Sequence, residues 1–191
     1  MRCRGWKGVI IVGFAGVLWM PTVARSETTP TTPSPRALEA IRLIESPDPY
    51  QRQLGFLQLE ALREPSTIEV IERYVARPEP EVRAESLRAV AAIQGFSAAP
   101  QLLQALKTER SPMVRRAAML GLEPFVQGHP DLLPAFVNAL RDRSTEVRMT
   151  AVDIVSRIDD PAAREAIRRR NKRERGRDVR RVLDLAMRRL Q

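Results

Sequence analysis

The sequence has few of the residues on which most catalytic and metal sites depend. Its 191 residues include one cysteine, Cys3, and one histidine, His129. A histidine without a second histidine or a cysteine beside it cannot form the usual zinc site, and no Gly-x-Ser-x-Gly motif places a nucleophilic serine. The adjacent carboxylates Asp159 and Asp160 are explained more simply by helix capping than by acid–base catalysis. We therefore expect neither an enzyme nor a bound metal or other cofactor.

The first 26 residues are typical of a secretory signal peptide. Basic residues in the first seven positions precede an uncharged apolar run over residues 8–20, and the triplet Ala24-Arg25-Ser26 puts small residues at positions −3 and −1 of a cleavage site. The run has 13 residues before Pro21, whereas a membrane-spanning helix needs about 20. Cleavage after Ser26 is therefore favoured over an uncleaved anchor, and we expect a periplasmic or secreted protein.

Cleavage would also change the composition of the chain. The cysteine and both tryptophans lie within residues 1–26, so the mature chain could form no disulfide and packing alone would have to stabilise it. Residues 27–35 read ETTPTTPSP, which predicts a disordered Pro/Thr linker. Residues 27–160 have 16 basic and 19 acidic groups, net −3, whereas residues 161–191 have 12 basic and 4 acidic groups, net +8. The basic character therefore belongs to the C-terminal end.

One sequence phrase recurs along residues 36–191. Its first marker is an arginine at intervals of 31, 32, 33 and 32 residues, namely Arg52, Arg83, Arg115, Arg148 and Arg180. A mostly small residue follows three positions later, and apolar residues follow seven and ten positions later. These offsets place the four positions on one face of a helix. Shorter helices are expected between the copies, beginning near Ser66, Ala98, Asp131 and Pro161, with a leading helix from Pro35.

This phrase resembles the short HEAT-like repeats of the phycobilisome-lyase type, over nearly all of residues 36–191. The resemblance implies an all-α fold, a right-handed α-solenoid of about five HEAT-like helix pairs, with a concave surface lined by the shorter helices. It implies little about function, because such repeats occur in scaffolds, in adaptors and in a few enzymes. The recurring arginine would be a framework residue that bonds to neighbouring turns, which we prefer to an anion-binding ladder.

Two surfaces are candidates for partner binding. The shorter helices are expected to point a mixed set of charged and polar side chains outward, which suits a protein surface: Glu69, Glu72, Arg73, Gln101, Gln104, Lys107, Asn138 and Arg141. The C-terminal basic run supplies the second set: Arg168, Arg169, Arg170, Lys172 and Arg173. A terminal repeat needs a polar outer face, so this run could be a solvated cap. Its single dominant sign favours an anionic partner.

The nature of that anionic partner follows from the compartment. Nucleic acid would satisfy the charge, but export and the few aromatic residues available for base stacking argue against it. Acidic proteins, anionic lipid headgroups and envelope polymers fit better.

Three functions remain in order of preference. The first is an exported scaffold or adaptor that binds a protein on its concave surface. The second is an electrostatic binder of anionic membrane or envelope surfaces, and the third is a lyase-like enzyme, for which the sequence shows no nucleophile. Salt separates the first two, because ionic strength screens charge–charge attraction.

Cleavage after Ser26 is the first testable prediction. Intact-mass analysis of the protein in envelope fractions should give the mass of a chain that begins at Glu27, and this product should lack tryptophan fluorescence because Trp6 and Trp19 are removed. A mass that still includes Met1 would contradict cleavage.

Overall fold

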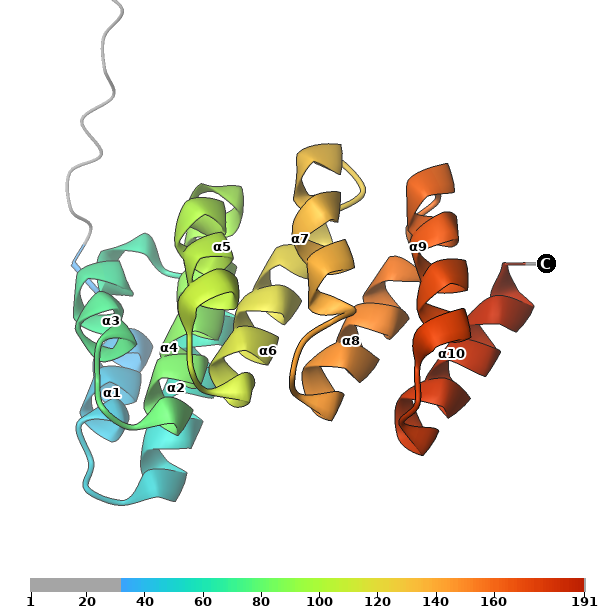
Figure 1. The fold of residues 1–191 in the computed structure, drawn as a ribbon. Coiled ribbons are helices and arrows are strands. Elements are labelled where there is room, and N and C mark those ends of the chain that lie inside the picture. The colour runs from blue at the N-terminus through green and yellow to red at the C-terminus, as the bar shows by residue number, and fades with distance from the viewer. Residues whose placement is uncertain (1–31, 191) are drawn as a thin grey trace, which may run out of the picture.

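The computed structural model describes residues 32–190, and these residues form two layers of α-helices (Figure 1). The predicted signal peptide, residues 1–26, and residues 27–31 of the predicted linker lie outside the described part. In chain order the helices are α1 Pro35–Ile44, α2 Pro49–Leu62, α3 Ile68–Val75, α4 Pro80–Gln94, α5 Ala99–Thr108, α6 Pro112–Leu122, α7 Leu133–Ala139, α8 Thr145–Val155, α9 Pro161–Arg173 and α10 Arg177–Arg189.

Each odd-numbered helix packs against the even-numbered helix that follows it, and the even-numbered helices also pack against one another in order along the array. Residues 32–190 therefore form five helix pairs, which confirms the predicted solenoid. The recurring phrase lies in the even-numbered helices, which form one layer, and the odd-numbered helices form the other. Short 3-10 turns lead into three of the odd-numbered helices: Pro65–Thr67, Gly95–Ala98 and Pro130–Leu132.

The predicted linker, residues 27–35, overlaps the start of the first helix, which begins at Pro35 as predicted. Pro35 is the first residue of α1, and the hydroxyl of Ser34 accepts a hydrogen bond from the N–H of Ala37 at 3.2 Å. Ser34 also donates, through its N–H, to the carboxylate of Glu64 at 3.0 Å. The last two residues of the predicted linker, Ser34 and Pro35, thus belong to the first helix pair, because they cap and start its first helix.

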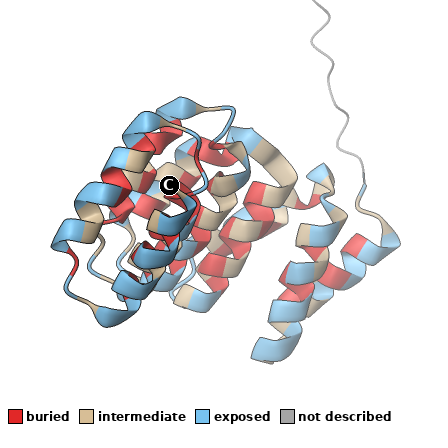
Figure 2. Cartoon of the chain, turned by 90° about the vertical axis from the view of Figure 1, so that its right-hand side faces the viewer, coloured by how far each residue is buried: buried red, intermediate tan, exposed pale blue. Residues whose placement is uncertain are grey.

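The small residue three positions after the arginine, present in α2, α4, α6 and α8, lets the two layers approach closely, as Gly55 shows. At Gly55 in α2, a β-carbon would lie 2.7 Å from Cγ2 of Ile44 and 2.8 Å from the carbonyl oxygen of Ala40, both in α1. Side chains from both layers then form one continuous buried core along the array, which Figure 2 shows between the exposed outer surfaces. The apolar position seven residues after the arginine is at the centre of this core in α2, α4, α6 and α8.

A core truncation tests this packing. Leu122 has no exposed surface, so Leu122→Ala should lower the free energy of unfolding by about 2–5 kcal/mol, because it removes buried methyl groups and leaves a cavity. Leu185 on α10 is 55% exposed, and Leu185→Ala should change the same quantity by less than about 1 kcal/mol. Urea denaturation followed by circular dichroism measures both, and equal losses would contradict the central place of Leu122.

Candidate partner-binding surfaces

The recurring arginine joins successive helix pairs along one edge of the solenoid. In α4, Nη1 of Arg83 donates to the carbonyl oxygens of Arg77 and Pro78, both at 2.8 Å, in the turn that leads into its own helix. The Nε and Nη2 groups of Arg83 donate to the two carboxylate oxygens of Glu109 at 3.0 and 3.1 Å. Glu109 lies in the equivalent turn of the next helix pair. One guanidinium thus connects two turns.

Arg115 repeats this arrangement, Arg148 repeats it with a single contact to its carboxylate, and we call the three together the arginine ladder. Arg115 binds its own turn carbonyls and donates to both carboxylate oxygens of Asp142 at 2.8 and 2.6 Å. Arg148 binds its own turn in the same way and pairs with Glu174 at 3.3 Å. Each ladder carboxylate lies six residues before the next recurring arginine. The predicted framework role of this arginine agrees with these contacts.

The ladder pairs are shielded from solvent, which alters the acidity of their carboxylates. The side chains of Arg115 and Asp142 are 5% and 12% exposed. Burial by itself raises the pKa of Asp142, but hydrogen bonds from Arg115 and from the N–H of Ser144, with the charge of Arg115, outweigh burial and hold the pKa below its usual value. Glu174 follows the same pattern, with Gly176 and Arg170 as donors. Both carboxylates are therefore kept charged.

The structure divides the C-terminal basic run into two kinds of residue. Arg170 is only partly exposed and forms an ion pair with Glu174, so it supports the last ladder carboxylate. Arg168, Lys172 and Arg173 are exposed on α9 and have no ion pair within residues 32–190, whereas the exposed Arg169 lies 3.7 Å from Glu165. Arg170 was predicted as a partner-binding residue, and the structure gives it a structural role that the sequence did not indicate.

The predicted side chains of the shorter helices do point outward. Glu69, Glu72, Arg73, Gln104, Lys107, Asn138 and Arg141 are exposed, and Gln101 is partly exposed. Some of them are engaged locally, since Glu69 pairs with Arg73 at 3.4 Å. A cavity between α7 and α9 has a volume of only about 30 Å³, whereas Arg73 of α3 lines one of about 440 Å³. The structure therefore places these side chains on one face, whose depth differs along the array.

Two further hollows lie on the opposite face, along α4. One cavity of about 390 Å³ and another of about 490 Å³ are each lined by α2, α4 and α6, and both include Arg88 and Leu120. We call this continuous depression the α4 groove. The floor of this groove has small side chains, because alanines of α4 line it. These are Ala84 in the first cavity and Ala91 in the second.

An apolar stripe on α2 meets the α4 groove at Tyr50, which lines the first cavity. Tyr50, Leu54 and Leu57 follow one another at helical spacing on the outer side of α2, and they are 81%, 48% and 47% exposed. Across the groove, Met113 at the start of α6 is 46% exposed. We call Tyr50, Leu54 and Leu57 the α2 stripe. Contiguous exposed apolar side chains beside a depression are typical of protein-binding surfaces, and the sequence analysis did not select these residues.

The remaining polar candidates have structural contacts. The ring of His129 stacks on that of Phe96, with 3.5 Å between the ring centroids. Asp160 caps α9 by accepting hydrogen bonds from the N–H groups of Ala162 and Ala163, and Asp159 pairs with Arg164. Within residues 32–190 no group of three histidine, cysteine, aspartate or glutamate residues is placed to hold a metal ion. In the same residues, no helix has both the length and the apolar character required to cross a membrane.

Comparison with known proteins agrees with this architecture. A family model of HEAT repeats matches residues 37–123 and residues 99–188. Among solved structures, the chain is similar to the complex of CpcE and CpcF of phycocyanin lyase from Nostoc sp. PCC7120, with 22% sequence identity and a TM-score of 0.65 over 79% of this chain and 97% of that chain. At this identity the likeness shows the fold alone. No curated protein matches the sequence.

The arginine ladder should make the free energy of unfolding depend on pH, and a variant of Asp142 tests this. Asp142→Asn should lower the free energy of unfolding by about 3 kcal/mol at neutral pH, because the buried Arg115 loses its charged partner. The pKa of Asp142 is lowered in the folded protein. The charged Asp142 therefore contributes fully to the free energy of unfolding above the pKa it has in the unfolded chain, about 4. This contribution is lost as the pH falls through its lower pKa in the folded protein.

The difference in the free energy of unfolding between the wild type and Asp142→Asn should consequently become smaller below about pH 4. Urea denaturation across a pH series measures it. Asp153→Asn is the matched control, because the side chain of Asp153 is 51% exposed, and it should cost less than about 1 kcal/mol at any pH. A gap that stays constant down to the acid limit would contradict the role given to the charge of Asp142.

Proposed function

Because the chain belongs to the HEAT-repeat family, we propose that it is a scaffold or adaptor that binds another protein. The observation that carries this proposal is the α4 groove with the α2 stripe beside it. Folding leaves the large apolar side chains of Tyr50, Leu54 and Leu57 in contact with water, and covering them with a partner would release that water favourably. The groove beside them offers concave depth for a partner segment.

The polar lining of the groove suggests what such a segment looks like. Glu81 and Glu85 lie on α4, and Arg88 and Arg116 line the same hollow. Burial raises the pKa of Glu85 above its usual value, although the charge of Arg88 opposes this. A segment with apolar side chains toward α2 and both signs of charge toward α4 would fit. The similar solved structure is a complex of two chains, which supports a protein as partner.

The face formed by the shorter helices is the other surface for the same function. Its exposed side chains mix both signs of charge with amides, as the rim of a protein interface does. In HEAT-like arrays this face commonly lines the concave side, so we keep its eight residues as candidates. The α4 groove is favoured because it has both depth and exposed apolar surface.

A second function is supported by the exposed cations of α9. Arg168, Lys172 and Arg173 are unpaired within residues 32–190, and unpaired cations on one helix attract anionic surfaces at low ionic strength. We propose anionic membrane or envelope surfaces as the alternative partner, in keeping with export to the periplasm or the outside of the cell. A lyase-like activity is the third hypothesis. It is suggested by the similar solved complex, but no described residues form a reactive cluster that would carry it.

Paired apolar substitutions test the preferred function. The double variant Tyr50→Ser, Leu57→Ser removes both ends of the α2 stripe, and Leu38→Ser, Leu185→Ser removes two exposed leucines elsewhere. Both variants should fold, because all four side chains are exposed. Quantitative capture from envelope extract should show a protein retained by the wild type and by the control, and reduced about fivefold or more in the stripe variant, since each lost apolar anchor costs more than about 1 kcal/mol.

Salt and a third variant distinguish the electrostatic alternative. Retention through the α2 stripe should change little between low and high salt. The variant with glutamine at positions 168, 169, 172 and 173 keeps Arg170 for the ladder and should retain the same protein. If this glutamine variant loses retention at low salt and the stripe variant keeps it, the cations of α9 carry the binding and the preferred function is wrong.

A further inference from the structure

The first turn of the solenoid departs from the arginine ladder. Arg52 makes the usual contacts with its own turn, because its Nη1 donates to the carbonyl oxygens of Ser46 and Pro47 at 3.1 and 2.7 Å. The ladder carboxylate for Arg52 should lie six residues before the next recurring arginine, Arg83. That position is Arg77. The turn has a cation where each of the following three turns has a carboxylate.

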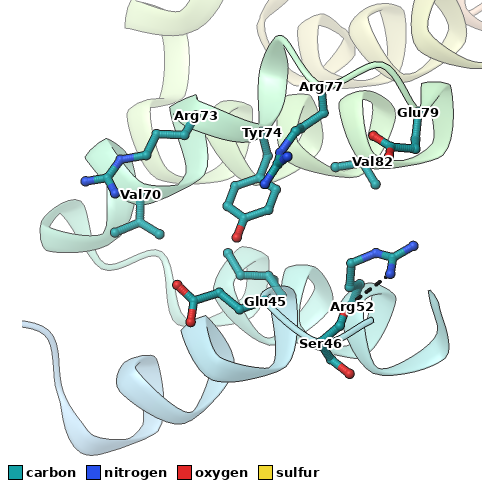
Figure 3. A pocket seen from close by; sticks show the side chains of 10 residues that line it. Glu45, Ser46, Arg52, Val70, Arg73, Tyr74, Arg77, Glu79 and Val82 are labelled. Atoms are coloured by element: carbon teal, nitrogen blue, oxygen red, sulfur yellow. Dashed lines mark hydrogen bonds between the residues drawn. The ribbon is translucent and has the colours of Figure 1, made fainter. Parts of the chain in front are cut away.

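The first two turns therefore present two arginines, Arg52 and Arg77, whereas the later turns pair an arginine with a carboxylate. Within residues 32–190, neither Arg52 nor Arg77 forms an ion pair with a carboxylate. Arg77 lies instead against the ring of Tyr74, with its guanidinium carbon 5.4 Å from the ring centroid (Figure 3). The Nε and Nη2 groups of Arg52, which correspond to the groups that hold the carboxylate in the later turns, have no hydrogen-bond acceptor in this part of the chain.

A cavity of about 440 Å³ opens beside both arginines. Figure 3 shows Arg52 and Ser46 on one side of it and Tyr74 and Arg77 on the other. Two carboxylates, Glu45 and Glu79, also line the cavity but pair with neither arginine, and Glu45 points away from Arg52 in Figure 3. The cavity is far larger than one carboxylate group, so a carboxylate could enter it together with the chain that carries it.

We propose that Arg52 and Arg77 bind the carboxylate of a ligand, which takes the place of the missing ladder carboxylate. The free edge of Arg52 presents two parallel N–H donors, which match a carboxylate bidentately, as Arg83 matches Glu109 at 3.0 and 3.1 Å. Arg77 adds a second cation within the same cavity. The source is an acidic side chain of a protein or a small carboxylic acid. Arg52 also lines the α4 groove, which favours the protein side chain.

This proposal rests on the ladder geometry and does not require the proposed scaffold function. Its first test restores the ladder within the chain. Arg77→Glu places a carboxylate at the ladder position, and Arg77→Gln removes the same cation without adding one. Arg77→Glu should melt about 2–4 °C above Arg77→Gln, because only the glutamate can pair with Arg52. In an Arg52→Gln background this difference should disappear. Equal melting temperatures in the wild-type background would contradict the ladder position of residue 77.

The second test titrates ligands against the protein and follows the side-chain Nε–Hε nuclear magnetic resonance signal of Arg52, assigned with Arg52→Lys. The ligands are glutarate, a capped peptide with one central glutamate, and inorganic phosphate. Glutarate or the peptide should shift the signal saturably in the wild type. The apparent dissociation constant should weaken about tenfold or more in Arg77→Glu, because an internal carboxylate then occupies the site.

The outcomes separate the sources of the carboxylate. Tighter binding of the peptide assigns the site to protein side chains, and tighter binding of glutarate assigns it to small acids. Phosphate binding tighter than both would contradict a carboxylate site, as would unchanged affinity in Arg77→Glu or the absence of any shift in the wild type. A stripe variant that loses its captured protein but still binds glutarate would leave this inference intact, so the two proposals fail independently.

Discussion

The ion pair between an arginine of one helix pair and a carboxylate of the next is the contact that aligns the array. Each ladder arginine also binds the carbonyl oxygens of its own turn, so a single side chain sets the distance between two consecutive turns. The pairs are buried enough that a lost partner leaves an uncompensated charge. The three intervals that a ladder pair joins, from Arg83 to Arg180, are 32, 33 and 32 residues long, although the residues between the helices vary in type.

The fold could be predicted because its information is local and repeated. An arginine, a small residue and two apolar residues at helical offsets define each even-numbered helix, and each pair packs only on its neighbours. Gly55 shows why the small residue recurs, since α1 approaches α2 there within van der Waals contact. The role of Arg170 was harder to see. Its spacing of four residues from Glu174 is visible in the sequence, but the burial of Glu174 depends on Arg148 of another helix pair.

The α4 groove and the α2 stripe could not be derived in the same way. In α2, one apolar face contains Phe56 and Leu59, and the other contains Leu54 and Leu57. Periodicity alone cannot say which face meets the rest of the protein, because that depends on where α1 and α4 pack. The depth of the groove likewise depends on the small side chains of α4, which lie between larger side chains of α2 and α6. Outward positions on the shorter helices were predictable, whereas the hollow on the opposite face required the assembled array.

The position of the ladder has a consequence for the response to salt. All three ladder carboxylates lie in the turns that lead from an odd-numbered to an even-numbered helix, at one edge of the array. Contacts between successive turns at the other edge are more exposed, as in the pair of Arg157 with Glu123, where the arginine is 49% exposed. Ionic strength should therefore act first on this exposed edge, because salt screens exposed ion pairs more than buried ones.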